Sequence, residues 1–259
     1  MIFRVSLVLA VIVLGIGALL VSPTLKPQPI ALADAVIEMD PDDPNLARVY
    51  LTVVDSGPPD FLMTAGSPIA GRTEVTEVVS AAGLPMPGGS ALLASDGAHI
   101  RLMSLDGPLQ EGQLVPVTLN FETTGPVTIR AKVGAMTPVA DHQMEDTADH
   151  TMGTGPVEIA PSSAPVITLT MSDETTALLA VDGITLSEAA MGKSHETGSG
   201  HGHLYLDGVK IGRVFGGPIS LPKLAPGSRE IRVTLFTNDH RPYLSGDMPV
   251  GATLKIIAP

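Results

Sequence analysis

Residues 194–208 read SHETGSGHGHLYLDG and hold three of the seven histidines of the chain. Because successive side chains of a strand point to opposite faces, His201 and His203 would lie on one face and the two leucines that follow them on the other. The Asp-Gly pair that ends the stretch favours a tight hairpin turn, and the VKIGRVF run after it would form the partner strand. We therefore predict a β-hairpin that holds two imidazoles side by side.

Two neighbouring imidazoles on a strand can chelate a late transition metal, although an HxH pair can equally be an ordinary exposed face of a strand. Further along, His240 follows an Asn-Asp pair at the end of a strand expected over residues 229–236. In a sandwich this histidine could lie near His201 and His203 and complete a three-histidine site. The alternative is that His240 only closes a turn and never reaches the pair.

His195 and Met248 are candidates for a further ligand of that site. The chain contains no cysteine, which excludes disulfides, thiolate zinc sites and cysteine nucleophiles. A histidine set without a thioether ligand favours cupric copper, with zinc as the rival ion. The formal net charge of −12 argues against a nucleic-acid partner, because phosphate binding needs clustered Lys and Arg.

Short Val-, Thr-, Leu- and Ile-rich runs between abundant Gly and Pro predict an all-β protein. We expect two β-sandwich domains, at residues 34–134 and 163–259. The first would be cupredoxin-like and the second immunoglobulin-like, with six or seven short strands. Residues 135–162 lack an apolar period and are expected to form a flexible linker.

The first 30 residues are expected to direct export. An apolar run spans residues 5–21 after Arg4, and its length lies between that of a signal-peptide core and a full membrane span. Residues 31–33 offer an A-x-A cleavage site, about ten residues beyond the run, which is farther than usual. We expect an apolar helix here, acting as a signal peptide or as an inner-membrane anchor. Either outcome places the rest of the chain in the periplasm.

Five segments in order, ARVYLTVVDSG, SPIAGRTEVTEVV, GLPMPGG, HIRLMSLDGPLQEGQLVPVTLNFETTG and VTIRAKV, cover most of residues 47–133. Their order and wording resemble the periplasmic copper chaperone family called PCu(A)C. The resemblance implies a compact β-domain. It also implies binding of cuprous copper by two histidines and two methionines.

The ligand positions of that family are mostly replaced in this chain. Thr76 stands where the first histidine of the family would be, and the segment after it is too short to carry the first methionine. His99 matches the second histidine, but Arg101 stands at the second methionine position. Met103 would share a strand face with His99 and form a substitute pair. The alternative is that Met103 packs in a core and His99 is a remnant.

The expected linker contains two H-x-M units, His142 with Met144 and His150 with Met152. Imidazole with thioether is a soft donor set that favours copper over calcium or magnesium. Histidine- and methionine-rich tails also follow the folded domain in many members of the family that the chain resembles. We expect these units to capture copper loosely and pass it on, because ordering a flexible segment costs affinity.

The sequence favours an exported copper-binding protein that captures copper and transfers it to or from another exported protein. The copper would be cuprous or cupric. A different hypothesis is a structural or partner-binding pair of β-sandwiches that has lost its metal. Catalysis is not expected, because no nucleophile motif, cofactor fingerprint or carboxylate pair accompanies the histidines.

Overall fold

The computed structural model describes residues 28–78, 81–134 and 155–259 and confirms the all-β prediction for them. The expected apolar helix at residues 5–21 lies outside the described residues. Within the described part of the chain, no helix is long and apolar enough to cross a membrane.

Nine strands build a first unit, and they begin before the predicted boundary at residue 34. Its strands are β1 (Ile30–Met39), β2 (Leu46–Asp55), β3 (Asp60–Gly66), β4 (Ala70–Val75), β5 (Leu84–Met86), β6 (Gly89–Leu93), β7 (Ile100–Leu105), β8 (Leu114–Phe121) and β9 (Gly125–Val133). The candidate cleavage site at residues 31–33 lies inside β1, where it pairs with β2. Cleavage there would remove residues that belong to the sheet.

The first unit wraps its strands around one apolar core. The pairing runs β6-β2-β1-β9-β8-β3-β5, and β7 joins β2 to β4. In β8, the alternating residues Val115, Val117, Leu119 and Phe121 are buried, as their period of two predicts.

Eleven strands and two short 3-10 helices form the second unit. The strands are β10 (Val157–Glu158), β11 (Val166–Met171), β12 (Thr176–Asp182), β13 (Thr185–Leu186), β14 (Ser199–Leu206), β15 (Val209–Val214), β16 (Gly217–Ser220), β17 (Gly227–Phe236), β18 (Tyr243–Ser245), β19 (Met248–Pro249) and β20 (Gly251–Ala258). The 3-10 helices are η1 (Pro161–Ser163) and η2 (Glu188–Ala190). β10 pairs with β18, so the last part of the expected linker belongs to this unit.

The second unit packs two sheets face to face, β11-β12-β16 and β20-β17-β14-β15, and β10-β18-β19 form a third, smaller sheet. Leu204 and Leu206 of β14 are buried in the core between the sheets, as predicted. Ile231 and Val233 of the neighbouring strand β17 lie in the same core. The histidine face of β14 therefore points away from this core.

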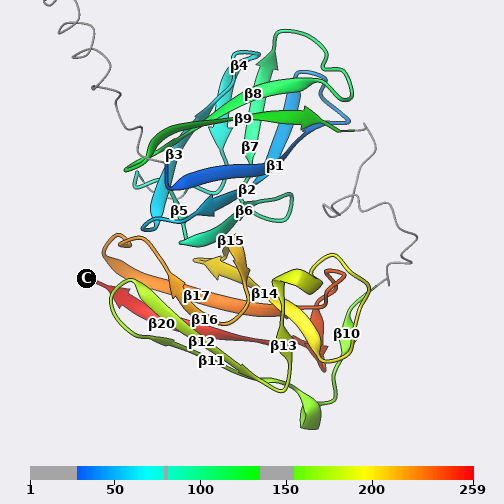
Figure 1. Ribbon diagram of the computed structural model, residues 1–259, viewed down its shortest axis with the longest axis vertical. Helices are drawn as coiled ribbons and strands as arrows, with labels where there is room; N and C mark the ends of the chain where they lie inside the picture. Colours follow the sequence, from blue (N-terminus) through cyan, green and yellow to red (C-terminus); the bar gives the residue numbers. More distant parts are fainter. Residues whose placement is uncertain (1–27, 79–80, 135–154) are drawn as a thin grey trace, which may run out of the picture.

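The two units are packed against each other (Figure 1), and β15 of the second pairs with β6 of the first at Gly212 and Ala91. A Cβ at Gly212 would lie 2.9 Å from the carbonyl oxygen of Ser90, so glycine permits this close approach. One apolar cluster includes buried residues of both units. The units are thus joined by backbone pairing as well as by the chain between them.

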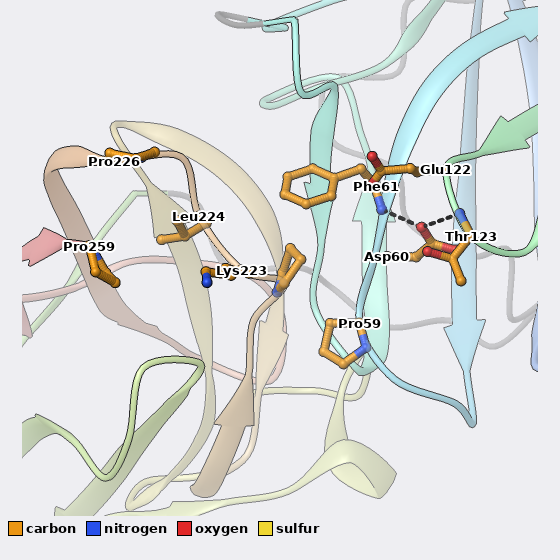
Figure 2. A pocket seen from close by; sticks show the side chains of 10 residues that line it. Pro59, Asp60, Phe61, Glu122, Thr123, Lys223, Leu224, Pro226 and Pro259 are labelled. Atoms are coloured by element: carbon orange, nitrogen blue, oxygen red, sulfur yellow. Dashed lines mark hydrogen bonds between the residues drawn. The ribbon is translucent and has the colours of Figure 1, made fainter.

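A cleft of about 500 Å³ lies at the edge of this junction (Figure 2). Pro59 and Phe61 line it from the first unit, and Leu224 and Pro226 line it from the second. The Asp60 carboxylate at its wall accepts hydrogen bonds from backbone amides of its own unit, including that of Thr123. This carboxylate serves the fold rather than the cleft.

Candidate metal centre

Strands β14 and β17 place the two histidines of the HxH pair. His201 lies opposite Phe236 and His203 lies opposite Thr234 in the antiparallel register. The ring of Phe236 stacks on that of His203, with centroids 3.8 Å apart and planes 16° apart. Both histidines are buried, with 0% and 2% of their surfaces exposed. The pair is not an exposed strand face.

Glycines on either side of His201 make this arrangement possible. A Cβ at Gly200 would lie 2.2 Å from the carbonyl oxygen of Phe236. A Cβ at Gly202 would lie 2.7 Å from a methyl carbon of Val214. Real Cβ atoms do not come so close, so the GHGH pattern lets β17 and β15 approach β14 on the core side.

His240 reaches the pair from a tight turn after β17. The amide of His240 donates to the carbonyl of Thr237 at 3.1 Å, and the amide of Thr237 donates to the carbonyl of Arg241 at 2.9 Å. His240 has a positive φ of 62°, a conformation that histidine adopts more readily than most residues. Its ring centroid lies 4.7 Å from that of His201. His240 therefore both closes a turn and joins the pair.

The turn itself is held by buried polar contacts. The carboxylate of Asp239 accepts a hydrogen bond from Nε of Arg241 at 3.0 Å and another from the hydroxyl of Thr237. Burial raises the pKa of Asp239, but these hydrogen bonds outweigh burial and hold the pKa below its usual value. The side-chain oxygen of Asn238 accepts a hydrogen bond from the hydroxyl of Ser199 in β14 at 3.2 Å. These contacts fix the turn to the strand that carries the other two histidines.

The three imidazoles are close enough to share one ion. Each offers a nitrogen, and the three nitrogens lie within 4.8 Å of one another. The Nε2 atoms of His201 and His203 are 3.1 Å apart. A metal bonded to both at about 2.0–2.1 Å would subtend an angle of roughly 100°, which suits a tetrahedral or trigonal site. We refer to His201, His203 and His240 as the histidine triad.

Burial keeps the strand histidines of the triad in the form that binds metals. It lowers the pKa of His201 to about 2, with the charges of His240, Arg213 and Lys210 acting in the same direction. It lowers the pKa of His203 as well. Neutral imidazole is the metal-binding form, so protons do not compete for these nitrogens near neutral pH.

The hydrogen bonding of these two rings also fits metal ligands. The Nδ1 atoms of His201 and His203 are buried without a hydrogen-bond partner, and their Nε2 atoms face each other. Two neutral rings can share one N–H···N bond only if one Nε2 carries the proton. Metal binding then requires a change of tautomer in that ring and no net loss of a proton. The residues present therefore fit a metal ion.

The other expected ligands of the second unit lie outside the triad. The ring of His195 makes an edge contact with that of Tyr243 at 6.0 Å. Met248 lies on β19 and is 71% exposed. Burial raises the pKa of Tyr243 to about 12, so its hydroxyl stays protonated and donates to the carbonyl of Ser199 at 2.8 Å. His195 thus packs near a residue that supports the site.

In the first unit, His99 bonds to neighbours that are poor metal ligands. Its Nδ1 lies 3.0 Å from the carbonyl of Gly97 and 3.3 Å from the hydroxyl of Thr76. The position that carries histidine in the family that the chain resembles thus supplies a hydroxyl to His99. Met103 is half-buried on β7, where it lies opposite Leu46 and Arg72 in the register. A His99–Met103 metal pair stays a prediction.

His142, Met144, His150 and Met152 lie outside the described residues. Sequence reasoning missed Phe236 and Arg213, which flank the pair from β17 and β15. The register of a strand pair reveals such neighbours. The period-two pattern in residues 231–236 marks Phe236 as sharing the polar face of its strand, and that signal was available in the sequence.

Residues 30–133 match the family described as "Putative lipoprotein LpqE-like". A curated relative, "Putative lipoprotein Lxx21020" of Leifsonia xyli subsp. xyli, is 47% identical over 53 residues, which are 19% of this chain and 32% of the relative. The match thus spans about a third of the length of that relative. The family match ends before the second unit begins, and the histidine triad lies outside it.

Among solved structures, the chain is similar to the copper-bound PCuAC domain from PmoF2, with 25% identity over 41% of this chain and 93% of that one, at a TM-score of 0.36. It is also similar to CuI-DR1885 from Deinococcus radiodurans, with 25% identity over 46% of this chain and 85% of that one, at a TM-score of 0.35. Fibronectin(III)-like modules of CbhA from Clostridium thermocellum are 10% identical over 88% of this chain and 93% of that one, at a TM-score of 0.25.

Proposed function

We propose that this chain is an exported protein that binds copper at the histidine triad and exchanges it with another exported protein. The observation that carries the proposal is the meeting of His201, His203 and His240, with one nitrogen of each within 4.8 Å of the others. Two ligands on one strand and a third on a turn that is hydrogen-bonded to that strand make this a preformed site. A preformed site spares the entropy of ordering its ligands when metal binds.

The donor set supports copper as the ion. Imidazole nitrogen suits copper and zinc, whereas calcium and magnesium prefer oxygen ligands. The resemblance of residues 47–133 to copper chaperones adds support, although Thr76 and Arg101 replace two family ligands. Zinc is the rival ion, because three histidines with one open position also suit zinc.

The proposal places the protein in the periplasm, either free or anchored to the inner membrane by residues 5–21. The apolar run at those residues and the lipoprotein name of the family matched by residues 30–133 support export. The partner would be a protein that donates or accepts copper. The H-x-M units at residues 142–152 would add weaker sites that feed the exchange.

We propose binding rather than catalysis for this site. His201 and His203 are buried and His240 is half-buried, so the triad is largely covered by protein. A substrate that must lie beside the metal would have little room there. A buried ligand set of this kind favours holding an ion over turning over a substrate.

The test is a copper titration of the full chain with metal analysis. We expect the His201→Ala, His203→Ala double variant to lose one equivalent of bound copper. The matched control is His195→Ala, which removes a histidine of the same unit that lies outside the triad, and it should keep that equivalent. Equal copper content in the double variant and the unchanged chain would exclude the triad as the site. No copper in either would favour a tandem sandwich that has lost its metal.

A further inference from the structure

The histidine triad supplies no negative charge to a bound ion. The described residues form one group of possible ligands, and it contains three imidazoles and no carboxylate. An ion bound by this group therefore keeps its full positive charge inside a buried site, because all three donors are neutral. The desolvation cost of an ion rises with the square of its charge, so a divalent ion pays about four times as much as a monovalent one.

Cationic side chains lie on the same face of the sheet as the triad. Arg213 of β15 is the cross-strand partner of His203, on the side of β14 opposite Thr234. Lys210 is the cross-strand partner of Tyr205, two residues further on, and is 3% exposed. Directly opposite residues of an antiparallel pair have their Cβ atoms about 5 Å apart. Lys210 is paired with a carboxylate, so the charge of Arg213 is the main positive charge beside the triad, and it repels a divalent ion twice as strongly as a monovalent one.

The nearby carboxylates are already engaged by other cations. Asp239, next to His240, receives a hydrogen bond from Arg241 at 3.0 Å. Asp96 lies 2.7 Å from Nζ of Lys210. Neither carboxylate belongs to the ligand group of the triad, and each is paired with a cation, so neither leaves a net negative charge to balance an ion bound there.

From this charge environment we infer that the triad selects a soft monovalent ion, cuprous copper or its analogue silver, over cupric copper and zinc. The inference rests on the proposed function and names the ion that the site takes. Zinc needs a fourth ligand beyond the three imidazoles, and in this buried site that ligand would be a neutral water that adds no negative charge. The burial of the triad thus reverses the preference for cupric copper that a bare three-histidine set suggests.

The test compares silver, zinc and cupric ions on the full chain, each in competition with a chelator of known affinity. The difference between the unchanged chain and the His201→Ala, His203→Ala double variant isolates binding at the triad. We expect that difference to be largest for silver, with triad affinity at least ten-fold higher than for zinc. Zinc or cupric ion bound at the triad as tightly as silver would overturn the inference and leave the proposed function intact. If the double variant bound all three ions as tightly as the unchanged chain, the proposed function would be overturned instead.

A second variant tests the charge argument within the same site. Thr234 lies opposite His203 and is 6% exposed, so Thr234→Asp adds a carboxylate beside the triad. We expect it to raise the affinity for zinc relative to silver by about ten-fold or more. Thr234→Asn is the matched neutral control and should leave the ratio unchanged. If both variants changed the ratio of zinc to silver affinity equally, the charge argument would be contradicted. If Thr234→Asp does not fold, the ranking of silver, zinc and cupric ion by their affinity for the unchanged chain decides the inference.

Discussion

The ring of Phe236 lies against that of His203 at a centroid distance of 3.8 Å, and it also lies 6.3 Å from that of His201. Nδ1 of His203 has no hydrogen-bond partner, and its Nε2 faces Nε2 of His201, the atom that a metal would replace as partner, so the stacked ring of Phe236 is what holds this imidazole from outside the triad. In many metal sites a carboxylate or carbonyl performs this task. Here an aromatic ring on the neighbouring strand does so.

Replacing Phe236 by leucine should therefore weaken metal binding while the second unit stays folded. Loss of an outer partner of a ligating histidine costs about 10- to 100-fold in metal affinity, and we expect a decrease in that range. Competition with a chelator measures it. Phe121→Leu, a buried change in the first unit, is the control and should leave the affinity unchanged. Equal affinity in the Phe236→Leu variant would show that stacking does not position His203.

Gly200→Ala should damage the site through the backbone. The new Cβ would lie 2.2 Å from the carbonyl oxygen of Phe236, so β14 and β17 would have to separate. We expect the free energy of unfolding to fall by about 1–3 kcal/mol, as for other overpacked core positions, together with loss of metal binding. Chemical denaturation measures the first effect.

Gly66→Ala is the matched control, because a Cβ at Gly66 meets nothing within 4 Å. It should change the free energy of unfolding by less than about 0.5 kcal/mol. If Gly200→Ala were as harmless as Gly66→Ala, the close approach of β17 to β14 would be wrong.

Local pattern was sufficient to predict the hairpin and the core face of β14. Leu204 and Leu206 are buried because they follow the period-two rule, and the Asp-Gly turn joins β14 to β15. The sequence left two alternatives open for His240, one in which it approaches His201 and one in which it only closes a turn. The approach depends on the path of residues 237–241, which is set by hydrogen bonds between the Thr237 hydroxyl and the backbone of Arg241 that no periodicity encodes.

The burial of the face of β14 that carries His201 and His203 could not be predicted from the alternation of apolar and polar residues alone. A strand with one polar face is predicted to expose that face to solvent, but His201 and His203 on the polar face of β14 are buried as well. His240 is one element of this cover, since its ring centroid lies 4.7 Å from that of His201. Such cover comes from contacts far apart in sequence. The same is true of the backbone pairing between the two units.

The ion pair of Lys210 and Asp96 should stabilise the junction of the two units. Nζ of Lys210 lies 2.7 Å from the Asp96 carboxylate, and the lysine is buried whereas the aspartate is half-exposed. Asp96→Asn removes the carboxylate charge that lies against a buried ammonium group, so we expect a loss of about 1–3 kcal/mol in the free energy of unfolding. Adding Lys210→Met should recover part of that loss.

A double-mutant cycle by urea denaturation gives the coupling energy of the pair, with the single variant Lys210→Met completing the cycle. A coupling near zero would mean that the pair is only a surface contact. A coupling of about 1 kcal/mol or more would show that the charge on the first unit helps to hold β15 of the second.

Asp60 at the wall of the cleft should make the stability of the first unit depend on pH. Its carboxylate accepts hydrogen bonds from the amides of Phe61 at 2.8 Å, Thr123 at 3.0 Å and Thr124 at 2.8 Å (Figure 2 shows the first two). Burial raises the pKa of Asp60, but these hydrogen bonds outweigh burial and bring the pKa below its usual value. The start of β3 is thereby tied to the turn between β8 and β9.

Because the pKa of Asp60 is lower in the folded state than in the unfolded state, its contribution is fully present above the unfolded pKa of about 4 and is lost as pH falls through the folded value. Asp60→Asn keeps the shape but not the charge, and it should lower the free energy of unfolding at pH 7 by about 1–3 kcal/mol. The variant and the unchanged chain should then converge below pH 4, as followed by denaturation between pH 7 and pH 3. Asp106→Asn, an exposed carboxylate in the same unit, should track the unchanged chain throughout. The difference in the free energy of unfolding between Asp60→Asn and the unchanged chain could instead stay constant down to pH 3. That result would show that the variant removes packing and not the charge of Asp60.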